Sequence, residues 1–371
     1  MSGIPPVLDP VSCRLRQETL RNYLSEKGLD GAIFFNRHYV YCLSGYWHEQ
    51  PLTPTAILIE TDGDSLIFTH QENPNAPAAD EVVHYSPNHL FTLKPNLSGC
   101  IAEVLNPRIS GLSKIGTDEQ TPAAMLSGVE SIDITEDYQY LRRRKYSDEV
   151  AALEFTIQCA ERAYAAALQL IEPNIEEVEL MAAMQEEATF AAGELLSGWG
   201  QDFQCGVPGG FAMRSKKAKA GELYILDVGV GVRGYRSDLC RTFAVDGSPT
   251  SAQQNAHAKI VEVMKAGEAY LKPNKSCREM YDFVHGSLDG WEGCAFIHHA
   301  GHGIGLDAHE VPRINPAWDD TFSTGDVIAF EPGLYREDLY GGIRLENNYL
   351  ITDSGFRQLS HFPLDLTVTE T

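Results

Sequence analysis

Four acidic side chains lie within or beside apolar, strand-like segments, where folding alone would favour apolar residues. Asp227 interrupts an otherwise apolar run, and Asp238 follows it by eleven positions in a second run. Glu331 and Glu346 repeat this pattern about a hundred residues later. A carboxylate within a core-like strand is costly unless a cation or hydrogen bonds compensate it. Taken singly, Asp227 could be a strand-end residue that accepts hydrogen bonds within the hairpin, and either glutamate could be a structural residue paired with Arg344.

Histidines are concentrated in the segment 296–310. This segment contains four of the twelve histidines within twelve positions, separated by glycines: His298, His299, His302 and His309. Such a density favours a binding site over isolated structural histidines. The helical HExxH motif of one zinc peptidase class is absent, and the glycines argue against a helix here.

Together these residues have the composition of a metal site. Four carboxylates and one imidazole could hold two divalent cations, because four negative charges balance four positive ones. Hard oxygen donors with a single nitrogen favour Mn²⁺ or Co²⁺, with Zn²⁺ as an alternative. Such a pair lowers the pKa of a bridging water and supplies hydroxide at neutral pH. The residues therefore favour a metal-dependent hydrolase.

The order of these motifs resembles the pita-bread metallopeptidases, the family of methionine aminopeptidase, aminopeptidase P and prolidase. That order is Asp, a second Asp eleven positions on, GHGIG-x-x-x-HE, EPG-x-Y and GIR-x-E. The resemblance implies that Asp238 and Glu346 bridge two metals and that Asp227 chelates one of them. His302 and Glu331 would complete the coordination.

The resemblance also assigns residues outside the metal ligands. His309 matches a histidine that contacts the scissile amide or the tetrahedral intermediate. His298 matches a supporting histidine, and Arg344 matches an arginine of the prolidase and aminopeptidase P branch. The segment 36–45 resembles part of a creatinase-type N-terminal domain. The implied activity is cleavage of Xaa-Pro bonds, in a dipeptide or at a peptide N-terminus.

The sequence departs from that branch at one position. Prolidases and aminopeptidases P carry a P-H-G histidine, whereas this chain has Pro208, Gly209 and Gly210. A histidine there would stabilise the intermediate or shuttle a proton. Its absence favours, as the alternative, a non-peptidase member of the same fold: a small-molecule C–N hydrolase or a protein like dimethylsulfoniopropionate lyase. A non-catalytic binding module is a third alternative, which the five intact ligand positions disfavour.

The elements that position these residues form two weakly similar halves. Each half consists of a helix, a Pro-Asn pair, a second helix and a hairpin. We expect the hairpins at 223–229 with 235–245 and at 327–331 with 342–346. The first third of the chain alternates helix and strand patterns. The sequence thus predicts an α/β N-terminal domain at 1–144 and, at 145–371, an α+β pita-bread catalytic domain with pseudo-twofold symmetry.

Length and charge limit the partners. The 371 residues carry 29 Lys+Arg against 52 Asp+Glu, a formal net charge of −23, which disfavours nucleic acid and anionic membrane surfaces. No apolar run is long enough for a membrane span, and the start does not resemble a signal peptide. The eight cysteines form no CxxC pair and suggest reduced thiols. We therefore expect a cytoplasmic enzyme acting on a small peptide or small molecule, and the resemblance implies a homodimer.

Overall fold

The computed structural model describes residues 3–49, 53–71, 76–86, 97–122, 125–200 and 202–367. The chain divides into two compact units, of which one is Val7–Arg142. The other is Arg143–Thr371 together with the residues up to Pro6. The sequence predicts the boundary after Arg144, and that residue number stays a prediction. Among the described residues, no helix is both long and apolar enough to cross a membrane.

The N-terminal unit is built on a six-stranded mixed sheet with the order β4-β3-β2-β1-β5-β6. Its strands are β1 (Gly31–Phe34), β2 (Ala56–Glu60), β3 (Ser65–Thr69), β4 (Glu81–His84), β5 (Lys114–Thr117) and β6 (Glu130–Asp133). The predicted hairpin is confirmed, because β2 and β3 pair antiparallel. The outer pairs β3–β4 and β5–β6 are parallel, so each pair is joined by a crossover connection and not by a tight turn.

The described part of this unit contains four α-helices beside the sheet: α1 (Pro10–Lys27), α2 (Arg37–Ser44), α3 (Leu97–Ile109) and α4 (Thr135–Leu141). Helix α1 begins after Asp9, whose carboxylate accepts hydrogen bonds from the amides of Val11 and Ser12. Such an N-cap satisfies amides that have no partner inside the helix. The helices and sheet give the α/β N-terminal domain that the sequence predicts.

The first half of the second unit places two helices against a sheet. Helices α5 (Ser147–Ala167) and α6 (Glu177–Ala192) precede β7 (Gly198–Gly200), β8 (Leu223–Val232), β9 (Tyr235–Arg236) and β10 (Leu239–Ala244). The predicted hairpin is confirmed: β8 and β10 pair antiparallel, with Asp227 opposite Cys240. All ten residues of β8 are buried, so the carboxylate of Asp227 lies inside the protein.

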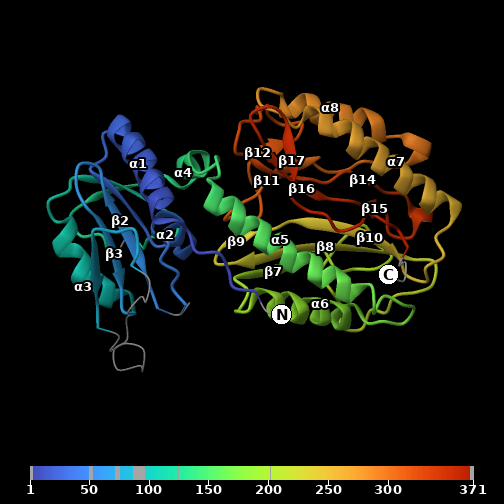
Figure 1. Ribbon diagram of the computed structural model, residues 1–371, viewed down its shortest axis with the longest axis horizontal. Coiled ribbons are helices and arrows are strands. Elements are labelled where there is room, and N and C mark those ends of the chain that lie inside the picture. Colours follow the sequence, from blue (N-terminus) through green and yellow to red (C-terminus); the bar gives the residue numbers. More distant parts are fainter. Residues whose placement is uncertain are drawn as a thin grey trace. The chain divides into compact units, whose positions relative to one another are not determined.

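The second half repeats this arrangement. Helices α7 (Ser251–Gly267) and α8 (Cys277–Leu288) precede a five-stranded sheet with the order β12-β11-β13-β16-β17. Its strands are β11 (Gly301–Gly303), β12 (Glu310–Ile314), β13 (Val327–Phe330), β16 (Asn347–Ile351) and β17 (Phe356–Gln358). In Figure 1, the sheets of the two halves lie between α6 and the pair α7–α8. The two-half α+β architecture predicted from the sequence is therefore confirmed.

Two local expectations were wrong. The second hairpin does not join 327–331 to 342–346, because β13 pairs with β16 and with β11. The short strand β15 (Ile343–Arg344) pairs instead with β14 (Gly333–Leu334). The local apolar pattern was right, but it does not specify which strand is the partner. The second wrong expectation concerns α6, for which the spacing of Asn174 and Glu177 predicts an N-terminal cap. In the structure, Asn174 has a positive φ of 79° and lies two residues before the N-cap, Glu176.

Candidate metal centre

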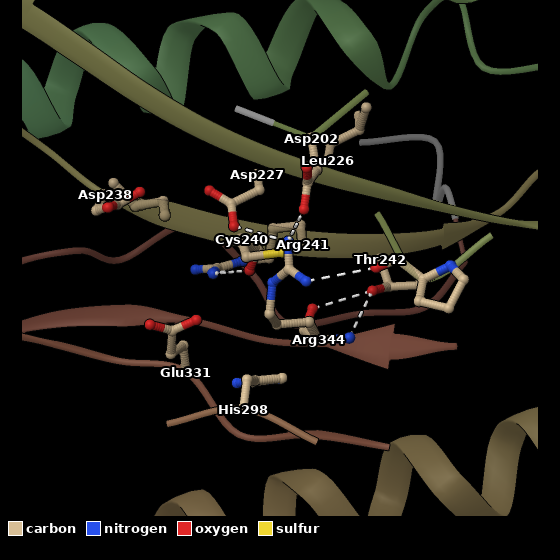
Figure 2. Close-up of polar contacts among 12 residues, drawn as sticks. Asp202, Leu226, Asp227, Asp238, Cys240, Arg241, Thr242, His298, Glu331 and Arg344 are labelled. Atoms are coloured by element: carbon tan, nitrogen blue, oxygen red, sulfur yellow. Dashed lines mark hydrogen bonds and ion pairs between the residues drawn. The ribbon is translucent and has the colours of Figure 1, made fainter. Parts of the chain in front are cut away.

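The five predicted ligands converge from both halves of the second unit. Asp227 lies on β8, and Asp238 immediately precedes β10. His302 is the central residue of β11, Glu331 directly follows β13, and Glu346 lies between β15 and β16. Figure 2 shows Asp227 and Asp238 on the first half of the unit, facing Glu331 on the second half. All five residues are at most 8% exposed.

Distances within the group fit coordination of a shared ion. One ligand atom each of Asp238, His302 and Glu346 lies within 4.8 Å of the other two. The Nε2 atom of His302 is 3.3 Å from a Glu331 oxygen and 3.7 Å from an Asp238 oxygen. Asp227 is ion-paired to Arg344 at 2.8 Å.

Three carboxylate oxygens in this group are buried without a hydrogen-bond partner among the described residues. They are Oδ1 of Asp227, Oδ1 of Asp238 and Oε2 of Glu346. A buried oxygen left in this way costs free energy unless a bound group satisfies it. Oxygen donors of this kind are the ligands that hard divalent cations take. The donor set therefore fits a metal centre.

The electrostatics of the group lead to the same conclusion. Burial raises the pKa of Asp238 and of Glu346 well above the usual range, and the neighbouring carboxylates raise each further. Burial also raises the pKa of Asp227, although the charge of Arg344 opposes this. Repulsion among like charges in a dry site disfavours the ionised forms. Cations bound between the carboxylates would remove this repulsion.

Arg344 is held between two aspartates, Asp202 and Asp227. The pairing of Arg344 with Glu331 or Glu346 that the sequence left open is not what the structure shows. The Nη2 atom of Arg344 donates to Asp227 at 2.8 Å and to Asp202 at 2.6 Å, and Figure 2 shows the three side chains together. Asp202 also accepts a hydrogen bond from the amide of Gly210 at 2.8 Å. Asp202 is not predicted from the sequence, because a single aspartate in a loop carries no motif.

His298 belongs to a chain of hydrogen bonds that starts at Arg344. The Nη1 atom of Arg344 donates to the Tyr335 hydroxyl at 3.2 Å, which lies 2.8 Å from Nε2 of His298. Nδ1 of His298 lies 2.6 Å from the carbonyl oxygen of His299. A carbonyl can only accept, so Nδ1 carries the proton and Nε2 accepts from the tyrosine. Burial lowers the pKa of His298, in agreement with this neutral form.

Two other histidines flank His302. The exposed His309 stacks on it, with ring centroids 3.8 Å apart and an interplanar angle of 14°. His299 contacts Glu331, with its Nε2 atom 2.7 Å from the carboxylate. Burial lowers the pKa of His299, but the hydrogen bond and charge of Glu331 outweigh burial and the net shift is upward. The structure thus brings together all four histidines of segment 296–310.

The glycines of the GHGIG motif permit close strand packing. A Cβ on Gly301 would lie 2.2 Å from the carbonyl oxygen of Ala329 on β13. A Cβ on Gly303 would lie 2.2 Å from the carbonyl oxygen of Val311 on β12. Strand β11 is therefore held tightly between its neighbours. This rigidity fixes the backbone that carries His302.

A buried ion pair holds the loop that follows. Nζ of Lys145 lies 2.7 Å from Oε2 of Glu310, and the side chains are 2% and 0% exposed. The other oxygen of Glu310 accepts hydrogen bonds from the amides of Leu306 and Asp307. The loop between His302 and His309 is thus anchored at its base.

The position of the absent P-H-G histidine is occupied by a carboxylate. A Cβ on Gly209 would lie 2.5 Å from Oδ2 of Asp202, the oxygen that binds Arg344. A side chain at Gly209 would therefore displace the Asp202–Arg344 contact. The contact between Asp202 and Arg344 therefore requires a residue without a side chain at position 209.

Comparisons with known proteins agree with this geometry. Residues 151–353 match the model of metallopeptidase family M24, and residues 16–142 match that of the creatinase/prolidase N-terminal domain. The uncharacterised peptidase YqhT of Bacillus subtilis is 26% identical over 95% of this chain and 100% of its own length. The Xaa-Pro dipeptidase of Pyrococcus horikoshii is 26% identical over 91% of this chain and 94% of its own length.

A solved structure of similar fold extends the comparison. The Xaa-Pro dipeptidase from Bacillus anthracis superposes with a TM-score of 0.79 and 22% sequence identity, covering 96% of this chain and 99% of that one. The predicted pita-bread fold is thereby confirmed. The chain belongs to metallopeptidase family M24 and carries a creatinase/prolidase N-terminal domain ahead of its peptidase domain.

Proposed function

We propose that this metallopeptidase is a two-metal hydrolase that cleaves Xaa-Pro bonds, in a dipeptide or at a peptide N-terminus. The observation that carries the proposal is the buried group of four carboxylates and His302, with three oxygens that lack a hydrogen-bond partner among the described residues. The relative from Pyrococcus horikoshii is named an Xaa-Pro dipeptidase and aligns over nearly the whole chain.

We assign the metal ligands as the five residues predicted from the sequence: Asp227, Asp238, His302, Glu331 and Glu346. Two divalent cations held there, Mn²⁺ or Co²⁺ by the carboxylate-rich donor set and Zn²⁺ as an alternative, would supply hydroxide at neutral pH and polarise a carbonyl.

The chain's own residues have distinct tasks in this proposal. Arg344 binds one oxygen of Asp227 and so leaves its other oxygen directed toward the site. His309 is exposed beside His302, where its imidazole can donate a hydrogen bond to the substrate amide. His298 holds Tyr335, which receives a hydrogen bond from Arg344. These contacts fix the orientation of Arg344.

The test is peptide hydrolysis by chelator-treated protein reloaded with Mn²⁺, Co²⁺ or Zn²⁺. We expect Xaa-Pro dipeptides or Xaa-Pro tripeptides to be cleaved only after reloading. Glu346→Gln should lose activity by about 100-fold or more, as expected for a metal-coordinating residue. Glu262→Gln, whose side chain is 69% exposed on α7, should retain it. Absence of Xaa-Pro cleavage with two metals bound would contradict the proposal.

A second function is favoured by the contact between Gly209 and Asp202. In place of the P-H-G histidine, this chain presents a carboxylate that is 31% exposed and bound to Arg344. This carboxylate, in place of the histidine, favours a substrate other than a peptide. Small-molecule C–N hydrolases and lyases of the same fold act on substrates of that kind. Assays of small amides and of dimethylsulfoniopropionate beside the peptides would distinguish the two functions.

We also propose a cytoplasmic location and a homodimer. All eight cysteines are buried thiols, which supports a reducing compartment. The homodimer follows from the family resemblance alone. Light scattering during size-exclusion chromatography would give the mass directly, and a value near the 41.0 kDa of one chain would contradict it.

A further inference from the structure

We propose that His299 is an additional metal ligand, so that one of the two metal positions carries two imidazoles. This inference rests on the proposed function, because it concerns the position assigned to His302 and Glu331. His299 lies in a nitrogen-donor group with His302 and His309, in which the ligand atoms are within 4.8 Å of one another. A second nitrogen would change which metal the position prefers.

His299 and His302 both contact the same oxygen of Glu331. One oxygen of this carboxylate lies 2.7 Å from Nε2 of His299 and 3.3 Å from Nε2 of His302. Neighbouring ligand atoms on one ion, each about 2.0–2.2 Å from it, are roughly 3 Å apart. Both imidazole nitrogens thus lie at the distance from the shared oxygen that donors to one cation have, and ligand atoms of His299 and His302 lie within 4.8 Å of each other.

Ring orientation selects His299 over His309. The rings of His299 and His302 are 5.5 Å apart at 66°, and two imidazoles on one ion have ring centres roughly 5 Å apart with converging lone pairs. The rings of His302 and His309 are 3.8 Å apart and nearly parallel. Parallel rings direct their lone pairs side by side, so His309 cannot join the same ion in this arrangement.

The backbone holds His299 in this place before any metal binds. The amide of Glu331 donates to the carbonyl of Ala300 at 3.0 Å, and the amide of Ala300 donates to Ile314 at 2.8 Å. These bonds tie the segment that contains His299 to both neighbouring strands. A ligand fixed by its scaffold loses little conformational entropy when the ion binds.

The consequence is that the two metal positions differ in chemistry. The position at Glu331 has two nitrogen donors, whereas the position at Asp227 has carboxylate oxygens only. Imidazole favours Zn²⁺, Co²⁺ or Ni²⁺, and carboxylates suit Mn²⁺ or Mg²⁺. We therefore expect the loaded protein to take a mixed pair, with the nitrogen-preferring ion beside His299.

The experiment counts imidazoles at a single bound ion. Metal-free protein receives one equivalent of Zn²⁺, and X-ray absorption fine structure at the zinc edge gives the number of histidine ligands. We expect two in the wild type and one in His299→Phe, which keeps a ring but removes both nitrogens. His285→Phe is the matched control, because His285 is 43% exposed on α8; it should show two.

Calorimetric titration of Zn²⁺ and Mn²⁺ completes the test. Loss of a supporting hydrogen bond alone lowers metal affinity roughly 10–100-fold, so the affinity for one metal does not discriminate. We expect His299→Phe to lower the ratio of Zn²⁺ to Mn²⁺ affinity about tenfold, since only Zn²⁺ gains markedly from nitrogen.

The outcomes separate this inference from the proposed function. A single imidazole in the wild type would overturn the role of His299 and would leave Xaa-Pro cleavage intact. Two imidazoles in a fully loaded protein that cleaves no Xaa-Pro peptide would support the role of His299 and overturn the proposed function. Because the wild type alone decides the imidazole count, the conclusion does not depend on the folding of a variant.

Discussion

At the residue scale, the buried carboxylates of Asp227, Asp238 and Glu346 share one energetic problem. Each has an oxygen without a hydrogen-bond partner among the described residues. Asp227 raises the pKa of Asp238, and both aspartates raise the pKa of Glu346. That cost makes such residues recognisable in the sequence, since an acid is rare within an apolar run. Their mutual distances, in contrast, come only from the folded chain.

Arg344 is the residue whose replacement best tests this network. Lysine keeps the charge but lacks the planar fork that contacts Asp227, Asp202 and Tyr335 together. We expect Arg344→Lys to lower kcat/KM for Xaa-Pro hydrolysis about 100-fold. The control is Arg233→Lys, which changes a comparable arginine paired with Glu194 outside the site. Equal activities of the two variants would show that the guanidinium contacts are dispensable.

The residues near the site differed in how far the sequence predicted their roles. His299 lies within the histidine-rich segment but received no role, because spacing does not reveal which imidazole faces a carboxylate. Tyr335 was part of the EPG-x-Y motif without an assigned task. Asp202 gave no signal at all, since its importance comes from Arg344, 142 positions away.

At the element scale, the pair Lys145–Glu310 anchors the loop that carries the later histidines. Replacing Lys145 by methionine would leave the fully buried carboxylate of Glu310 without its cation. We expect Lys145→Met to lower the free energy of unfolding by about 3 kcal/mol, measured by urea denaturation. Lys259→Met removes one partner of a pair with the exposed Glu262 and should cost under about 0.5 kcal/mol. A loss as small in Lys145→Met would contradict the anchoring role.

In the N-terminal unit, Asp80 links α1 to the sheet and gives a pH-dependent contribution. Burial alone would raise its pKa, but hydrogen bonds from the Ser65 amide and hydroxyl and the charge of Arg14 lower it from 3.8 to about 2. A lowered folded-state pKa means that the stabilisation is present above the unfolded value and is lost as the pH falls toward 2.

We therefore expect Asp80→Asn to be less stable than the wild type at about pH 6, by at most about 1 kcal/mol. The effect is small because Arg14 and Asp80 are 39% and 41% exposed. The difference should shrink by about pH 3. Urea denaturation at both values measures it, and a difference that grows on acidification would refute the assignment.

In the second half, the local sequence pattern predicts which segments form strands but not which strands pair. Segments 327–331 and 342–346 have the composition of strands, and both regions form strands. Their partners, however, are set by the sheet order β12-β11-β13-β16-β17. The close contact of Gly301 with Ala329 lets β11 lie beside β13, and β16 occupies the other edge of β13.

At the scale of the whole molecule, metal binding should govern stability. Without metal, Glu346→Gln removes one charge from a crowded group of carboxylates, so we expect it to unfold at a higher temperature than the wild type. With metal at 100 times its Kd, the wild type gains about 2.7 kcal/mol, and the order should reverse. Differential scanning calorimetry in chelator and in Mn²⁺ measures both unfolding temperatures. The prediction would be contradicted if Mn²⁺ stabilised Glu346→Gln as much as the wild type.

The cysteines give a second measurement on the whole molecule. All eight are buried thiols, and burial raises the pKa of several of them, including Cys159 to about 12. Because the thiolate is the reactive form, we expect a thiol reagent to label the native protein very slowly and all eight cysteines after denaturation. Rapid labelling of the native protein would show that part of the core opens readily.

The sequence by itself determined the chemistry: which residues could hold metals, the division into an α/β part and an α+β part, and the similarity of the two halves. These properties are readable because an acid in an apolar run and a period of two or 3.6 are local features. The tertiary structure alone decided the partners of those residues: Asp202 beside Arg344, His299 beside Glu331, and β13 beside β16. Such contacts join residues far apart in the chain, and their energies depend on distance and burial, which no local pattern specifies.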